Sequence, residues 1–267
     1  MLEDPASIHA KSPILSISPD SSLLDAINLM VARGVRRLRV ARAGEYTFTT
    51  VDSIIRILSE MSKLFTDDRS LRQVRIGSTN LVEPPVVGGD YTIRDIAGVM
   101  LKSNVDFVVV TGREYDAIMT VVDIIDAIDE KELDEPALNY ASRRYPMVKA
   151  GLKLIDAVKM MSSFRVRSVL VVDDEGNVLG AISSKQILKM VSNYGFNILG
   201  DDLESSVKPV RAFADPGSTL GTVAKLMRQT GSEIAVLNVG KHVLGIINEF
   251  GVLTGISGID RQGMSMA

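Results

Sequence analysis

Residues 166–188 read VRSVLVVDDEGNVLGAISSKQIL, and they contain the structural plan of the chain. The β-branched run from Ser168 to Val172 predicts a buried strand, and Gly176 follows it in a polar turn. The apolar run from Val178 to Ser183 predicts a returning strand, so the two runs form a hairpin. Ser183 is of a residue type favoured at helix N-caps, and it predicts a helix directly after the hairpin.

An amphipathic helix precedes this hairpin. Leu154, Ile155, Val158 and Met161 fall three or four positions apart, a spacing typical of a helix with one buried face. A short strand is expected before that helix, near residues 146–148. The predicted order is therefore strand, helix, strand, strand, helix.

The same pattern occurs four times along the chain, each time with a helix methionine, a turn glycine and a polar residue that starts the second helix. The methionines are Met30, Met100, Met161 and Met227, the glycines are Gly44, Gly112, Gly176 and Gly240, and the helix starters are Thr49, Thr120, Ser183 and Asn248. The starters are separated by 71, 63 and 65 residues. A repeat of this size cannot bury its apolar face alone, so the copies are expected to stack.

Composition restricts the function classes. The chain has 267 residues, of which 46% are apolar, so it can bury the core of one or two globular domains. A net charge of −3 argues against nucleic-acid binding through bulk electrostatics. The absence of cysteine excludes thiol catalysis, disulfides and zinc–thiolate sites. No apolar run approaches the roughly 18 residues of a membrane span and no signal-peptide pattern opens the chain, so a cytoplasmic protein is expected.

An acidic stretch separates the second and third copies. Residues 126–135 include six acidic residues and one lysine, and Pro136 follows them. A solvated helix end and a specific partner site are both compatible with this charge pattern. Either way, the stretch predicts two pairs of repeats. The first pair spans 1–133, with repeats at about 6–63 and 74–133, and the second spans 134–267, with repeats at about 138–195 and 203–260.

Two copies begin their second helix with the pattern TxxD, in Thr49–Asp52 and Thr120–Asp123. Threonine at the N-cap with an acidic residue three positions later is a capping box, which satisfies helix amides without any ligand. Ser183 with Gln186, and Asn248, fit a capping role equally well. The alternative is a ligand site, because a helix start offers amides to a phosphate and the aspartate can accept hydrogen bonds from sugar hydroxyls.

Arginines gather in the first copy, near the start of its central strand. They are Arg33, Arg36, Arg37, Arg39 and Arg42. Some of them are expected to be ordinary surface charge, but so many guanidinium groups in an acidic protein need partners, and phosphate oxygens match the guanidinium fork.

These repeats resemble the cystathionine β-synthase (CBS) domain family, most clearly in SPILSISPDSSLLDAINLM at 12–30 and in the stretch at 166–188. The resemblance covers nearly the whole chain. It implies an α/β (α+β) fold of four tandem β-α-β-β-α repeats paired into two Bateman modules, similar to the energy-sensing γ subunit of AMP-activated protein kinase. Clefts of such modules can hold adenine nucleotides or S-adenosylmethionine.

The resemblance also implies roles for single residues. Asp52 and Asp123 would bind ribose hydroxyls, and Thr49 and Thr120 would touch phosphate or the ribose edge. The adenine would lie against backbone at four positions, namely Ile14 and Leu15 in one cleft and Pro85 and Val86 in the other.

Phosphate contacts are implied for arginines at the start of the central strands. Arg36 and Arg37 match this position in the first copy, and Arg167 with Ser183 would hold a phosphate in the second half.

The chain departs from the family pattern in both halves. Tyr46 and Ala117 replace the usual glycine in the first pair, while Gln186 and Gly251 replace the aspartate in the second. Glutamine and glycine bring no charge to a ribose, so nucleotide binding is predicted chiefly in residues 1–133.

The leading functional hypothesis is a non-catalytic regulator that senses AMP, ADP or ATP and passes a shape change to a protein partner or through self-association. One alternative is a structural interaction module without a ligand. Binding of S-adenosylmethionine, and nucleic-acid binding through the arginine cluster, also stay open. An enzyme is least favoured, because no glycine-rich phosphate loop, nucleophile–base pair or metal-ligand cluster appears in the sequence, and no catalytic cofactor is expected.

Overall fold

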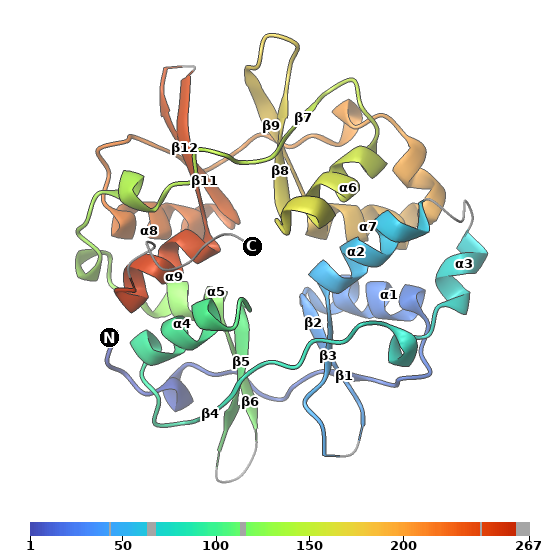
Figure 1. Ribbon diagram of the computed structural model, residues 1–267, viewed down its shortest axis with the longest axis horizontal. Helices are drawn as coiled ribbons and strands as arrows, with labels where there is room; N and C mark the ends of the chain where they lie inside the picture. Colours follow the sequence, from blue (N-terminus) through green and yellow to red (C-terminus); the bar gives the residue numbers. More distant parts are fainter. Residues whose placement is uncertain (43, 63–67, 113–115, 241, 260–267) are drawn as a thin grey trace. The chain divides into compact units, whose positions relative to one another are not determined.

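The computed structural model describes residues 1–42, 44–62, 68–112, 116–240 and 242–259. In these residues the chain forms four three-stranded sheets, one in each repeat. The first strand of each sheet lies parallel to the second, and the second pairs antiparallel with the third through a hairpin. One helix joins the first two strands and another follows the third, so the predicted repeat fold is confirmed (Figure 1).

The elements of the first two repeats follow the predicted order. Repeat 1 comprises β1 (Ser16–Ile17), α1 (Leu23–Arg33), β2 (Arg37–Val40), β3 (Phe48–Thr50) and α2 (Val51–Met61). Repeat 2 comprises β4 (Val86–Gly88), α4 (Ile93–Lys102), β5 (Phe107–Thr111), β6 (Ala117–Thr120) and α5 (Val121–Ala127).

The last two repeats have the same order. Repeat 3 comprises β7 (Met147–Lys149), α6 (Leu154–Phe164), β8 (Ser168–Val172), β9 (Val178–Ser183) and α7 (Ser184–Tyr194). Repeat 4 comprises β10 (Phe213–Ala214), α8 (Leu220–Thr230), β11 (Ile234–Val239), β12 (His242–Asn248) and α9 (Glu249–Ser257). The connections contain α3 (Asp68–Gln73) and the 3-10 helices η1 (Ala6–Ile8), η2 (Ile76–Ser78), η3 (Glu130–Glu132), η4 (Ala137–Tyr140), η5 (Phe196–Gly200) and η6 (Glu204–Ser206).

Local sequence explains most of these boundaries. The turn glycines Gly44, Gly176 and Gly240 have φ angles of 74°, 85° and 58°, a region that other residues enter only at an energetic cost. Helix α1 starts with a capping box between Ser22 and Asp25, which satisfies amides that have no partner within the helix. None of the helices among the described residues is both long enough and apolar enough to cross a membrane.

The chain divides into two compact units, each built from segments that are distant in sequence. Unit 1 comprises Met1–Ile14, Pro84–Arg144 and Val210–Ala267, and unit 2 comprises Leu15–Glu83 and Tyr145–Pro209. Repeats 2 and 4 therefore belong to unit 1, and repeats 1 and 3 belong to unit 2. The pairing of repeat 1 with 2 and of repeat 3 with 4 stays a prediction.

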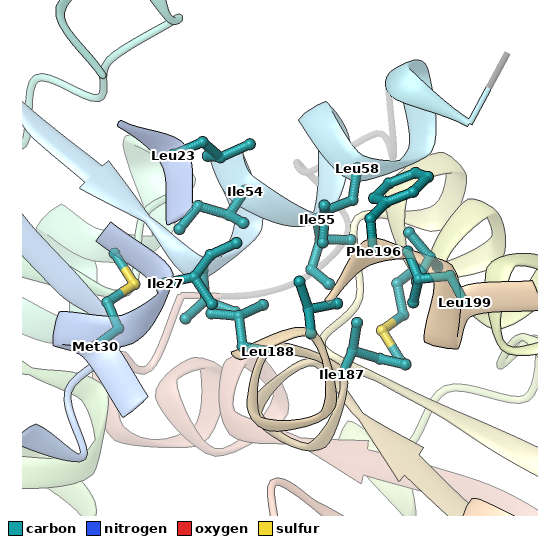
Figure 2. Packing of buried hydrophobic residues seen from close by; sticks show 14 of the residues in the cluster. Leu23, Ile27, Met30, Ile54, Ile55, Leu58, Ile187, Leu188, Phe196 and Leu199 are labelled. Atoms are coloured by element: carbon teal, nitrogen blue, oxygen red, sulfur yellow. The ribbon is translucent and has the colours of Figure 1, made fainter. Parts of the chain in front are cut away.

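Each unit is held together by its helices. In unit 2, α1 packs against α7 and α2 packs against α6. Figure 2 shows Ile27 and Ile54 of repeat 1 in one core with Ile187 and Leu188 of repeat 3. In unit 1, α4 packs against α9 and α5 packs against α8. The apolar helix faces predicted from periodicity thus cover each other between repeats.

The segment that leads into a repeat pairs with a different repeat. Lys11, which precedes repeat 1, forms a bridge with Ile118 of repeat 2, and Val82, which precedes repeat 2, forms one with Phe48 of repeat 1. The same exchange joins repeats 3 and 4, through Ser142 with Ile246 and Lys208 with Ala181. Each such segment extends the hydrogen-bonding of the third strand in the sheet that it reaches.

Candidate functional site

The helix start of repeat 2 holds a buried carboxylate. Thr120 is the N-cap of α5, and the amide and hydroxyl of Thr120 donate to Asp123 Oδ2 at 2.9 and 2.7 Å. The predicted capping box is confirmed. Asp123 is 5% exposed, and its other oxygen, Oδ1, forms an ion pair with Lys11. The hydrogen bond to Asp123 holds the pKa of Lys11 above its ordinary value.

The helix start of repeat 1 differs by one residue from the prediction. The N-cap of α2 is Thr50, whose Oγ1 accepts a hydrogen bond from the amide of Ser53 at 3.1 Å. The prediction of Thr49 as the helix start was wrong, because the β2–β3 ladder continues through Thr50. Ser53 therefore occupies the position that Asp123 holds in repeat 2, and Asp52 lies one residue before it.

Asp52 has a partner within the protein. Arg167 Nε donates to both carboxylate oxygens of Asp52 at 3.1 Å, and Arg167 Nη2 donates to Oδ2 at 2.8 Å. The Arg167 side chain is 13% exposed and that of Asp52 is 49% exposed. Asp52 was predicted to bind ribose and Arg167 to bind phosphate. In the structure these two side chains form an ion pair with each other, between repeats 1 and 3 of unit 2.

A cavity of about 730 Å³ lies in unit 1. Its walls come from the N-terminal segment, from α5 and η3, and from the first turns of α8. Asp123 and Lys11 line it together with Lys225 and Arg228 of α8. Its volume falls within the range of about 300–1,000 Å³ that is common for small-molecule sites.

The cavity wall carries charges of both signs. Its acidic side chains include Asp123, Asp126, Asp129 and Glu130, and its Lys and Arg side chains are Lys11, Lys225 and Arg228. Lys225 Nζ donates to Glu130 Oε2 at 2.6 Å, and Arg228 Nη1 donates to the backbone oxygen of Asp126 at 3.0 Å. The hydrogen bond from Lys225 holds the pKa of Glu130 below its ordinary value.

Comparison with known proteins identifies the repeats. The family model of the CBS domain matches residues 6–46 and 137–193, which lie largely in repeats 1 and 3. These two stretches are similar to the CBS domain family.

Solved structures have the same fold over nearly the whole chain. One is protein MJ1225 from Methanocaldococcus jannaschii, proposed as an archaeal homologue of γ-AMPK, with 20% identity, a TM-score of 0.80 and coverage of 94% of this chain and 99% of that one. Another is an uncharacterized conserved protein from Pyrococcus horikoshii, with 20% identity, a TM-score of 0.65 and coverage of 95% and 100%.

A curated relative matches only part of the chain. The uncharacterized protein MJ1232 from M. jannaschii is 23% identical over 124 residues. The match covers 46% of this chain and 41% of that protein, so this chain corresponds to about two fifths of the length of that relative.

The predicted adenine contacts of the CBS clefts lie apart from the residues that line the cavity. The backbone oxygens of Leu15 and Pro85 accept hydrogen bonds from the amides of Arg39 and Val109 at 2.9 and 3.0 Å. These residues therefore extend the parallel pairing of the first CBS strands. Ile14 and Pro85 are partly buried, and Val86 is 48% exposed.

The arginines predicted to contact phosphate lie at the starts of the central strands β2 and β8. The backbone oxygens of Arg36 and Arg167 accept hydrogen bonds from the amides of Val51 and Ser184 at 2.8 and 2.7 Å, which closes the start of each following helix. Arg37 is 9% exposed.

Ser183 caps α7 in a capping box with Gln186, as predicted.

Two arginines of the cluster in repeat 1 bind protein groups. Arg39 donates to the backbone oxygen of Glu45 at 3.0 Å and lies 4.8 Å from the centre of the Tyr46 ring. Arg42 donates to the backbone oxygen of Gly77 at 2.7 Å. Tyr46, which the sequence placed at the glycine position before the helix, packs under a guanidinium. Thr47 occupies that position once the register is corrected.

Two basic residues that line the cavity were not predicted from the sequence. Lys225 and Arg228 are three positions apart on α8 and share one helix face. The signal that could have found them is charge complementarity, since the acidic stretch at 126–135 needs basic partners. No group of three or more His, Cys, Asp or Glu residues in the described part of the chain could hold a metal ion.

Proposed function

We propose that this protein is a non-catalytic regulator that binds an adenine nucleotide in the cavity of unit 1. The observation that carries the proposal is the buried Asp123 carboxylate, which lines a cavity of about 730 Å³ together with Lys and Arg side chains. The CBS fold supports the proposal, as does the structural neighbour proposed as a homologue of γ-AMPK.

Each part of a nucleotide has a matching group in this cavity. Asp123 is already oriented by its capping box, so its Oδ1 would exchange Lys11 for a ribose hydroxyl at little ordering cost. Lys11 would then be released toward a phosphate. Each charge-assisted hydrogen bond contributes about 1.5–3 kcal/mol when it is partly desolvated.

Repeat 1 supports the proposal less than repeat 2 does. Asp52 is outside the capping position and is held by Arg167, so a ribose there would first have to break a bidentate ion pair. For Thr49, Arg36 and Arg37 a ligand role stays a prediction from resemblance.

Ligand binding would be linked to a change of packing. A nucleotide at Asp123 favours whichever arrangement of the cavity walls completes its contacts, and those walls come from the N-terminal segment and from repeats 2 and 4 with the connection that follows repeat 2. The exchanged leading segments would carry the change along the chain, because Lys11 both lines the cavity and bridges to repeat 2. We propose AMP, ADP or ATP as the sensed ligands and a protein partner as the receiver.

Calorimetric titration and thermal unfolding with AMP, ADP, ATP and S-adenosylmethionine test the proposal. Ligand at 100 times its dissociation constant should stabilise the intact chain by about 2.7 kcal/mol. Asp123→Asn should abolish this shift. Asp174→Asn is the matched control, because that side chain is 90% exposed and forms an ion pair with Lys149, which is itself 63% exposed. Loss of binding in the control alone, or an unchanged affinity in Asp123→Asn, contradicts the proposed site.

A structural interaction module is the second candidate. Lys11, Lys225 and Arg228 all have protein partners in the cavity, which is what a packing role without ligand requires. This candidate predicts no thermal shift with any of the four compounds.

A further inference from the structure

The junction between repeats 2 and 3 is the acidic stretch at 126–135. It lies against the first turn of α8. The amides of Leu220 and Gly221 donate to the backbone oxygens of Glu135 and Leu133 at 2.8 and 2.9 Å. The backbone at Glu130 approaches Gly221 so closely that a Cβ there would overlap the Glu130 carbonyl group. The junction backbone is therefore held on α8 by its own hydrogen bonds and by close packing.

The acidic side chains of the junction make further contacts with α8. Glu130 accepts hydrogen bonds from Lys225 Nζ at 2.6 Å and from the Thr222 hydroxyl at 2.8 Å. Asp126 accepts from Arg228 through its backbone oxygen at 3.0 Å, and its carboxylate lies 3.9 Å from Arg228 Nε. The junction thus places carboxylate oxygens over the basic face of α8, inside the wall of the cavity that contains Asp123.

We propose that the Glu130 carboxylate is an internal competitor for the phosphate of the ligand, holding Lys225 until a phosphorylated nucleotide displaces it and binds the basic face that Lys225 forms with Arg228. This inference rests on the proposed function, because it concerns the same cavity. A phosphate offers these two side chains the same acceptor oxygens as a carboxylate, with more charge. It would bind Lys225 and Arg228 while the ribose binds Asp123.

The exchange is energetically feasible. The side chains of Lys225 and Glu130 are 50% and 34% exposed, and those of Arg228 and Asp126 are 45% and 48% exposed. Ion pairs this accessible to water contribute little to stability, so their loss is readily offset by a bound phosphate. Occupancy would then release the Glu130 side chain on the junction that leads into repeat 3. The site would report its state to the other repeats through this carboxylate.

Titration of the full chain with adenosine and with AMP tests the inference. Glu130→Gln removes the competing charge, so AMP should bind about three- to fivefold more tightly while adenosine stays within about twofold. Misfolding cannot produce such a gain. The double variant Lys225→Gln with Arg228→Gln should weaken AMP about tenfold or more and leave adenosine unchanged. Lys189→Gln is the matched control, an exposed lysine of unit 2.

The outcomes separate the inference from the proposed function. If neither adenosine nor AMP binds the intact chain, the proposed function and the inference are both contradicted. If both compounds bind and Asp123→Asn abolishes binding, but Glu130→Gln has the AMP affinity of the intact chain, only the inference is overturned. Equal weakening of adenosine and AMP in the double variant also overturns it, because the two basic residues would then act on packing and not on the phosphate.

Discussion

Thr49 is a polar residue at an apolar position. It faces Leu38 in the β2–β3 ladder and is fully buried, and its hydroxyl has no hydrogen-bond partner. In the other repeats the corresponding positions hold Met119, Ile182 and Ile247, all buried. The structure therefore places Thr49 in the core of repeat 1, which its sequence pattern did not reveal.

Replacing Thr49 by valine should stabilise the protein. The substitution keeps the shape and removes an unsatisfied buried hydroxyl, so we expect a gain of about 1–2 kcal/mol in the free energy of unfolding by urea. Thr120→Val makes the same chemical change at a working N-cap and should cost about 1 kcal/mol. A loss of stability in Thr49→Val would mean that its hydroxyl has a partner after all.

The Arg167–Asp52 pair should contribute little energy despite its bidentate geometry. Asp52 is half-exposed, so solvent screens the attraction. A double-mutant cycle with Arg167→Ala and Asp52→Ala, measured by urea unfolding, should give a coupling of about 0.5–1 kcal/mol that decreases with salt. A coupling of several kcal/mol that persists in high salt would show instead that the pair is a buried element of unit 2.

Among the secondary-structure elements, the capping boxes make helix stability depend on pH. Hydrogen bonds from Ser22 hold the pKa of Asp25 below its ordinary value, and those from Thr92 do the same for the pKa of Asp95. A lowered pKa in the folded state means that the stabilisation is complete above the unfolded pKa. It is lost as pH falls through the folded value.

We therefore expect the melting temperature to decrease as pH falls from about 5 to below about 3. The double variant Asp25→Asn with Asp95→Asn should melt lower at pH 7 and show a flatter dependence in this range. Asp201→Asn, at an exposed aspartate, should keep the slope of the intact chain. Equal slopes in the intact chain and the double variant would refute the link between these caps and acid sensitivity.

Close backbone packing explains the glycine three positions before the helix start Ser183. A Cβ at Gly180 of β9 would overlap the backbone oxygen of Lys208, whose segment bridges to the next residue of the strand. Gly180→Ala should therefore destabilise the protein by about 1–3 kcal/mol in urea unfolding. Gly151→Ala is the control, since nothing lies within 4 Å of the added atom. Similar stabilities of the two variants would contradict the close approach.

In the molecule as a whole, the main helix contacts join residues 1–133 to residues 134–267. The helix pairs α1 with α7, α2 with α6, α4 with α9 and α5 with α8 each join the first half to the second. A fragment of residues 1–133 would thus expose the apolar faces of its helices to water.

We expect fragment 1–133 to self-associate or to unfold when expressed alone. Co-expression with 134–267 should restore a one-to-one complex with the melting curve of the intact chain. Light scattering coupled to size exclusion, together with circular dichroism, checks both outcomes. A monomeric fragment that melts cooperatively would contradict the helix pairing between repeats.

The sequence was sufficient for the repeats, the hairpins and most helix starts. Strand pattern, turn glycine and cap lie within a few residues of each other, so hydrogen bonds and local conformational preference decide them. The same locality predicted the Thr120–Asp123 box. The predicted start of α2 at Thr49 was wrong, because two adjacent threonines fit the cap equally well. Only ladder pairing with β2 selects Thr50.

The sequence predicted only part of the candidate site. Asp123 was predicted from its motif, but Glu130 and Lys225 are 95 positions apart and meet only because α8 packs on the junction. All eight helices of the repeats have similar apolar faces. The pairs that form therefore depend on how well whole surfaces fit together, which a local sequence pattern does not describe. The chain sequence therefore specifies four CBS-type repeats and their caps. Tertiary packing alone decides which repeats share a unit, and so which charges line the cavity.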